Sequence, residues 1–337
     1  MISKKSNFIS KFTKNKRGYY SFLIFCTLFC ATLFSEIIAN DKPLLVKYHN
    51  EIFFPFIINV PETTFGGQLK TKTDYQDPFI QNKINENGYI IFAPIKFSYN
   101  TINFNLSTPA PSKPTLTNII GTDDNGRDVA SRIMYGIRIS LIFGIILTTF
   151  SLALGITLGA VQGYFGGICD LILQRFIEIW SSMPMLFLLI ILSTIIVPGF
   201  FTLLFLMLAF SWISIVSYVR AEFLRLRNLD FVKASKSLGA MDSRIIFKHI
   251  LPNSSPIIIA NLPFVLAGSI TTLTSLDFLG LGLPIGSPSL GELLSQGKNN
   301  INSPWLGISS FLTITLLLTL LVFIGEALRD SFDSRKI

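Results

Sequence analysis

Six apolar runs divide this chain, and a long polar segment separates the first run from the other five. A helix needs about 20 mostly apolar residues to cross a bilayer. The last five runs reach that length, and the first falls slightly short. The pattern predicts an all-α polytopic membrane protein with about six transmembrane helices, over Tyr19–Ser35, Ile139–Val161, Phe176–Val197, Phe200–Val219, Pro256–Leu276 and Trp305–Gly325.

The first apolar run has two interpretations. A basic segment followed by a short apolar stretch is typical of a signal peptide as well as of a membrane anchor. No clear small-x-small cleavage site follows the run. We therefore expect a retained first helix over residues 19–39, preceded by a basic cytoplasmic N-terminus over residues 1–18.

The polar segment over residues 40–132 is rich in proline and in aromatic residues. Its aromatic content is too high for a disordered segment, and the alternating stretches 88–94 and 96–106 are typical of strands. These features predict a small, compact extracytoplasmic insertion after the first helix. The alternative is a packed spacer with no binding role.

A second polar stretch, residues 231–253, lies between two of the later apolar runs. Gly239 can turn the chain after a first short helix, and Asp242 is a suitable N-cap for a second. Pro252 is expected to stop that helix. The stretch therefore predicts two short helices joined by a tight turn, although an ordinary loop between membrane helices would also fit.

The residues of the second short helix divide between two faces. Ile245, Ile246 and Ile250 share one face at helical spacing, and Arg244, Lys248 and His249 decorate the other. Such an amphipathic helix can lie in the groove of a partner with its apolar face as the anchor.

Composition and charge agree with a membrane protein. The chain is 50% hydrophobic and 14% charged, with a mean hydropathy of +0.55. Its net charge of +8 is concentrated near expected cytoplasmic segments, as the positive-inside rule requires. No stripe of basic and aromatic residues suits base stacking, so no nucleic-acid partner is expected. Counting crossings from a cytoplasmic N-terminus puts residues 220–255 and 331–337 inside, and residues 283–304 outside.

The spacing of the residues excludes a nucleotide-binding loop and a calcium-binding loop. Residues 291–299 depart from a nucleotide-binding P-loop in both the glycine spacing and the final residue. Residues 123–134 lack the glycine and glutamate positions of a calcium loop, and their acids are better suited to a helix start. Cys26, Cys30 and Cys169 are expected to pack as small apolar residues. We expect no catalytic residue, metal or cofactor in this chain.

Two features inside the apolar runs predict helix contacts. Gly155, Gly159 and Gly163 recur every four residues, which lets another helix approach closely on that face. Glu178 has Arg175 nearby as a partner, and Pro184 interrupts the same run.

The polar stretch resembles the cytoplasmic "EAA" loop of permeases from ATP-binding cassette (ABC) importers. The matching positions are Lys233-Ala234-Ser235, Gly239 and Leu251-Pro252, with Lys233 where the family has an acid. Further segments from residue 121 onward are similar, in order, to the dipeptide, oligopeptide and nickel permeases. They are GTDDNGRDVASRIMYGIRISL, GYFGGICDLILQRFIEIWSSMP, VRAEFLRLRN, TSLDFLGLGLP, SPSLGELL, PWLGI and GEALRDSFD.

Residues 40–78 are similar to the exported insertion of the YejE type of these permeases, which is linked to uptake of peptides and of antibiotics like microcin C. The resemblance implies a type I permease core over residues 133–330 in a bacterial inner membrane, with residues 40–132 in the periplasm. It implies three partners: a homologous second permease, ABC ATPase subunits and a periplasmic peptide-binding protein. It also implies that the coupling loop, residues 220–255, contacts the ATPase through Lys233, Ala234, Ser235, Gly239, Arg244, Ile245, Ile246, Lys248, Ile250, Leu251 and Pro252.

Two other functions fit the residues without the resemblance. An ion-coupled secondary carrier would move a small solute without nucleotide, but the apolar runs are nearly free of ionisable residues and show no inverted repeat. A membrane-tethered binding module would use residues 40–130 for recognition, although five further crossings exceed what an anchor needs.

Overall fold

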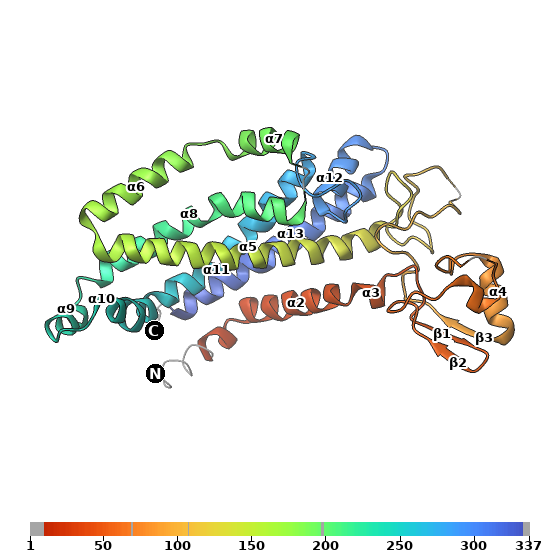
Figure 1. Cartoon of the computed structure of the whole chain (residues 1–337), viewed down its shortest axis with the longest axis horizontal. Helices are drawn as coiled ribbons and strands as arrows, with labels where there is room; N and C mark the ends of the chain where they lie inside the picture. Colours follow the sequence, from red (N-terminus) through yellow and green to blue (C-terminus); the bar gives the residue numbers. More distant parts are fainter. Residues whose placement is uncertain (1–9, 69, 107, 197–198, 333–337) are drawn as a thin grey trace.

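The computed structural model (Figure 1) describes residues 10–68, 70–106, 108–196 and 199–332. Parts of the predicted terminal segments 1–18 and 331–337 lie outside these residues. The helices are α2 Lys16–Leu33, α3 Ser35–Ile38, α4 Pro78–Asn87, α5 Val129–Phe165, α6 Gly167–Ser181, α7 Met185–Ile195, α8 Phe200–Leu226, α9 Asp230–Ser237, α10 Asp242–Arg244, α11 Leu251–Phe278, α12 Leu290–Asn299 and α13 Pro304–Phe332. Strands are β1 Leu45–Tyr48, β2 Glu51–Phe53 and β3 Gly88–Ile91, with a 3₁₀ turn at Glu62–Phe65 and a π-helical turn at Ile245–Ile250.

Among the described residues, four helical segments are long and apolar enough to cross a membrane: 129–165, 200–226, 242–278 and 304–332. Helices α6 and α7 add a fifth if they count as one span, because together they pass the same test but are bent by 61°. The break lies at the predicted interruption, where Pro184 is the N-cap of α7. The predicted first crossing corresponds to α2, which has 18 residues and is not among these segments.

The two ends of the bundle carry different elements (Figure 1). Helices α9 and α10 lie at the same end as the start of α2 and the end of α13. The three strands, α4 and α12 lie at the opposite end. This arrangement matches the predicted sidedness, in which the 220–255 loop shares a side with both chain ends and residues 283–304 lie on the other side.

The insertion contains a small antiparallel sheet with strand order β2-β1-β3. Val46 on β1 and Ile80 and Ile84 on α4 are buried together with Phe65. The predicted strand over 88–94 is confirmed by β3, whereas the predicted strand over 96–106 is wrong. That stretch instead packs on the start of α5, where the Phe97 carbonyl accepts a hydrogen bond from the Ser131 hydroxyl at 2.8 Å.

The glycine stripe of α5 faces α8, as predicted. A Cβ atom on Gly155 would lie 2.6 Å from the Ile215 side chain, and one on Gly159 would lie 2.8 Å from Val219. Gly163 is equally close to Phe223. Since real Cβ atoms do not approach so closely, only glycine permits this packing distance.

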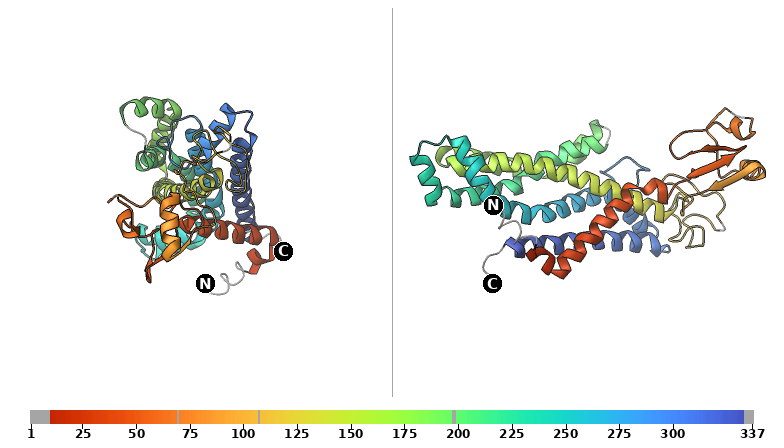
Figure 2. Two further views of the ribbon diagram at one scale, coloured as in Figure 1. Left: turned by 90° about the vertical axis from the view of Figure 1, so that its right-hand side faces the viewer. Right: turned by 90° about the horizontal axis from the view of Figure 1, so that it is seen from below.

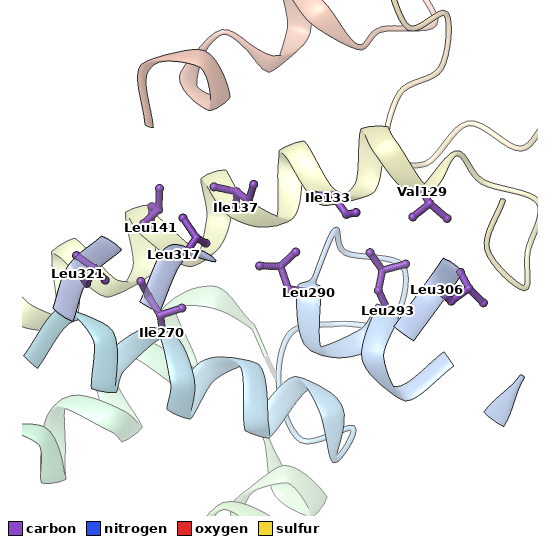
Figure 3. Close-up of a cluster of buried hydrophobic side chains, with 10 residues drawn as sticks. All are labelled: Val129, Ile133, Ile137, Leu141, Ile270, Leu290, Leu293, Leu306, Leu317 and Leu321. Atoms are coloured by element: carbon purple, nitrogen blue, oxygen red, sulfur yellow. The ribbon is translucent and has the colours of Figure 1, made fainter. Parts of the chain in front are cut away.

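One apolar core joins α5 to α11, α12 and α13 (Figure 3). Its α5 residues recur at helical spacing along one face, and the partner helices fill the gaps between them. The core consists of Val129, Ile133, Ile137, Leu141, Ile270, Leu290, Leu293, Leu306, Leu317 and Leu321.

Candidate functional site

Residues 230–241 form one short helix and a tight turn, as predicted, but the second predicted short helix is the start of a continuous helical segment over residues 242–278. Helix α9 ends at Ser237, and Gly239 follows with a φ of +78°, a conformation that glycine adopts readily. The Gly239 and Ala240 amides donate to the Lys236 and Ser235 carbonyls at 3.0 and 3.1 Å, which closes the end of α9. The turn then leads through α10 into the π-helical turn and α11.

The structure buries the three isoleucines of the predicted coupling face within this chain. Ile245 and Ile250 are completely buried and Ile246 is nearly so. They pack in a cluster with residues of α8, including Val219 and Phe223. Their apolar face therefore anchors the loop to the membrane bundle and is not available to a partner.

Two other predictions for this loop fail. Asp242 is not an N-cap: it is the first residue of α10, and its carboxylate accepts a hydrogen bond from the Tyr164 hydroxyl at 2.5 Å. Pro252 does not stop the helix, because it lies in the first turn of α11, which continues to Phe278. A proline is tolerated in a first helical turn, and the wider π-helical turn directly precedes it.

The exposed surface of the loop is apolar at its centre and basic at its edge. Leu238, Met241 and Phe247 are 87%, 77% and 69% exposed, and we name these three residues the loop patch. The predicted site residues Lys233, Ala234, Arg244 and Lys248 are also exposed, as is Pro252. Ser235 and Leu251 are half-buried. The loop thus exposes both apolar side chains and cations.

Polar contacts hold the loop to neighbouring helix ends. Besides the Tyr164 contact with Asp242, the Arg227 guanidinium donates to the Gly163 and Tyr164 carbonyls at 3.2 Å. Arg220 forms a two-bond pair with Asp170 at 2.6 and 2.7 Å. The end of α5, the start of α6 and the end of α8 are therefore tied together next to the loop patch.

Substitution of Gly239 should separate the effect of an added charge from that of an added side chain. No atom lies within 4 Å of a Cβ placed there, so only the positive φ opposes a side chain. Asn tolerates this conformation better than other residues. We therefore expect Gly239→Asn to retain substrate uptake and Gly239→Asp to reduce it strongly, because a new carboxylate also adds charge beside the loop patch. Transport assays at matched membrane levels test this; equal uptake by both variants would contradict a functional turn.

A cavity of about 410 Å³ opens between α7, α8 and α11. Its wall contains hydroxyl and amide groups at a depth where the surrounding helices are apolar, and we name it the polar cavity. The polar lining residues are Ser211, Ser214 and Tyr218 on α8, and Asn261, Ser269 and Thr272 on α11. Polar side chains exposed to lipid are costly, so this surface is suited to water, a partner or a solute.

Other exposed surfaces of the bundle differ from the polar cavity. Helix α13 exposes Phe311, Leu312 and Leu316. Helix α7 exposes Phe187 and Ile191. These apolar side chains are compatible with lipid.

A buried ion-pair network lies at the opposite end from the loop. The Arg132 side chain is completely buried, 3.4 Å from Asp123 and 2.9 Å from Glu292. It also donates to the Ser287 carbonyl at 3.0 Å. Arg127 pairs with the same two acids at 2.7 and 3.3 Å. The network joins α5 to α12 and to the loop before α12.

The acids of residues 123–128 serve the start of α5. Asp128 is the N-cap, as the helix-start interpretation predicted, and its carboxylate accepts from the Ser131 amide at 2.8 Å. Burial raises the pKa of Asp128, although bonds from Asn118 and Ser131 oppose that shift. Burial, and then the charge of Asp123, also raises the pKa of Asp124.

The chain is similar to a known family of membrane transport proteins. The sequence profile described as "Binding-protein-dependent transport system inner membrane component" matches residues 155–337. The chain is 54% identical to the inner membrane ABC transporter permease protein YejE of Escherichia coli K12, over 97% of this chain and 96% of that protein. It is 51% identical to the peptidoglycan transport system permease protein YejE of Agrobacterium fabrum, over 96% of this chain and 91% of the relative.

More distant similarities extend this comparison. The oligopeptide transport system permease protein OppC of Lactococcus lactis subsp. cremoris is 36% identical over 70% of this chain and 82% of its own length. A chain of the MetNI methionine ABC transporter in an inward-facing conformation superposes with a TM-score of 0.50, covering 60% of this chain and 97% of that chain at 17% identity. The latter similarity concerns the fold alone.

Proposed function

Because this chain belongs to the family of binding-protein-dependent transport system inner membrane components, we propose that its polar cavity forms part of a path for peptides. The chain is a multi-pass inner-membrane permease subunit of an ABC importer, and it is not itself an enzyme. Permease subunits of ABC importers work with ATPase and substrate-binding partners. The polar cavity carries the proposal, because hydroxyl and amide groups line it in an otherwise apolar bundle.

The proposed cargo is a peptide or a peptide-bearing fragment. The relatives include a peptidoglycan transport permease and an oligopeptide transport permease. The named polar groups of the cavity wall are hydroxyls and one carboxamide, on Ser211, Ser214, Tyr218, Asn261, Ser269 and Thr272. Such groups exchange hydrogen bonds with a peptide backbone whatever its sequence. The wall is therefore suited to passing peptides with different side chains.

The proposed partners act at opposite ends of the bundle. An ATPase subunit docks on the loop patch, whose apolar side chains share the exposed loop with Lys233, Arg244 and Lys248. A homologous second permease covers the polar cavity and completes the path, and a periplasmic peptide-binding protein delivers cargo at the end that carries the insertion. In this arrangement residues 40–132 are the periplasmic insertion and residues 133–330 the permease unit.

Thiol labelling tests the path. Cysteine at Ser214 or Asn261 should react with a membrane-impermeant maleimide at least about tenfold faster than cysteine at Phe311 or Leu316, because the thiolate that adds to the maleimide forms in water and not in lipid. The assay uses the assembled importer after Cys26, Cys30 and Cys169 are replaced by serine. Equal slow labelling at all four positions would show that the polar cavity is closed to water, and the proposed path would be abandoned.

A further inference from the structure

A second cavity, of about 270 Å³, lies on the α2 side of the bundle and is lined by side chains of α2, α5, α11 and α13. Its wall is almost entirely apolar, and we name it the α2 cavity. Only two lining residues carry hydroxyl groups. Thr149 donates to the Ile145 carbonyl at 2.7 Å, and Thr148 contacts the Ser269 hydroxyl at 3.5 Å. The cavity therefore offers no free polar group that would favour water.

The α2 cavity extends from the cytoplasmic end of the bundle to its middle, where Ile145 and Leu266 line it. Phe22 and Phe25 line it within three turns of the start of α2. Ile324 and Leu328 line it close to the end of α13. These two helix ends lie at the same end of the molecule as α9 and α10 (Figure 1). The cavity thus lies at the depth of one leaflet, which suits the acyl chain of a lipid.

Cations lie beside the cytoplasmic end of this cavity. Gly18 packs against Ala327, which places the first turn of α2 on the last turns of α13. Figure 2 shows α2 running obliquely along the bundle from that contact. Lys14, Lys16 and Arg17 are exposed at this position. No salt bridge joins these three cations to an acid within the part of the chain that the structure describes.

The nearby acid of α13 points away from the cavity. Glu326 lies two residues from both Ile324 and Leu328, and a separation of two residues places a side chain on nearly the opposite face of a helix. Arg329 and Asp330 follow Leu328, are both exposed and carry opposite charges. The positive charge at the mouth therefore comes from Lys14, Lys16 and Arg17.

We propose that the α2 cavity binds one anionic phospholipid from the cytoplasmic leaflet. One acyl chain fills the space between Phe22, Phe25 and Leu328, and the phosphate headgroup contacts Lys16 and Arg17. Basic residues next to a membrane helix attract anionic lipid headgroups, and an apolar cavity at the same end selects a chain in place of a soluble anion. This site is independent of the peptide path, which lies on the face formed by α7, α8 and α11.

Native mass spectrometry with lipid quantification tests the site. The assembled importer is purified from nanodiscs that contain phosphatidylglycerol and phosphatidylethanolamine, and the retained lipids are counted. We expect one retained phosphatidylglycerol. Each neutralised cation should weaken its retention about fivefold, so Lys16→Gln with Arg17→Gln should weaken it strongly. The control pair Lys70→Gln with Lys72→Gln removes two exposed cations of the insertion, away from the cavity, and should leave retention unchanged.

A cavity-filling variant separates the acyl-chain contact from the charge. Thr149→Trp should displace the lipid while keeping all cations, whereas Leu312→Trp on the exposed face of α13 should not. Equal retention of both phospholipids, or unchanged retention in Thr149→Trp, would overturn the proposal. Lipid bound to the isolated chain but absent from the assembled importer would also overturn it, because a partner subunit would then occupy the cavity.

Discussion

Replacing Leu238 and Phe247 by aspartate is expected to detach the ATPase and abolish uptake while leaving the chain in the membrane. Both side chains are exposed in the loop patch, so the folded chain loses little when they become polar. At an interface, loss of a buried apolar anchor typically costs about 2 kcal/mol or more, or roughly 30-fold in affinity for each anchor. Co-purification of the ATPase and a peptide uptake assay measure the two effects.

Two control variants distinguish loss of docking from an effect of added charge or of misfolding. Asn228→Asp adds one carboxylate to the same cytoplasmic region outside the patch and should keep the ATPase bound. Ile245→Asp should instead lower the amount of folded chain, because it would bury a carboxylate in the cluster against α8. If the patch variant keeps full ATPase binding, docking does not use Leu238 and Phe247.

Arg132→Met is expected to destabilise the bundle by about 3 kcal/mol, since breaking a buried ion pair leaves uncompensated charge. Both of its acidic neighbours would lose a cation, although Arg127 still contacts each of them. Thermal unfolding in nanodiscs at fixed lipid composition measures the loss. We expect the midpoint to fall well below that of the native chain.

A double-mutant cycle distinguishes lost charge balance from lost packing. Glu292→Gln removes one of the two acids that Arg132 compensates. If charge is the cause, the combination Arg132→Met with Glu292→Gln should unfold closer to the native chain than Arg132→Met does alone. Additive losses would assign the effect to packing of the arginine side chain.

Much of this fold could be predicted from local pattern. The apolar runs located most of the long helices because a bilayer imposes a minimum helix length. The stripe of Gly155, Gly159 and Gly163 predicted a close helix contact, and the structure confirms it against α8. These predictions are correct because each depends on residues that are near one another in the sequence.

The candidate site was harder to predict because amphipathic spacing does not say what covers the apolar face. Ile245, Ile246 and Ile250 were assigned to a partner, yet they pack on α8 of the same chain. A signal for the other face was present: Leu238, Met241 and Phe247 are large apolar residues outside the isoleucine spacing. The polar cavity was missed because its serines and asparagine come from two helices whose pairing only the fold reveals.

The comparisons decide between the functions that the sequence left open. Relatives that are 54% and 51% identical over nearly the whole chain are ABC permeases. An ion-coupled carrier and a membrane-tethered binding module find no such relatives among the proteins reported above.

The glycine contact between α5 and α8 has a mechanical consequence. The glycine backbone of α5 packs directly against side chains of α8 with no intervening space. The two helices are therefore expected to move together as one rigid body. Helix α8 bears the coupling loop at one end and, farther along, the Ser211, Ser214 and Tyr218 wall. A displacement of the loop by an ATPase would therefore move that wall as well, and the helices of the bundle would not need to repack first.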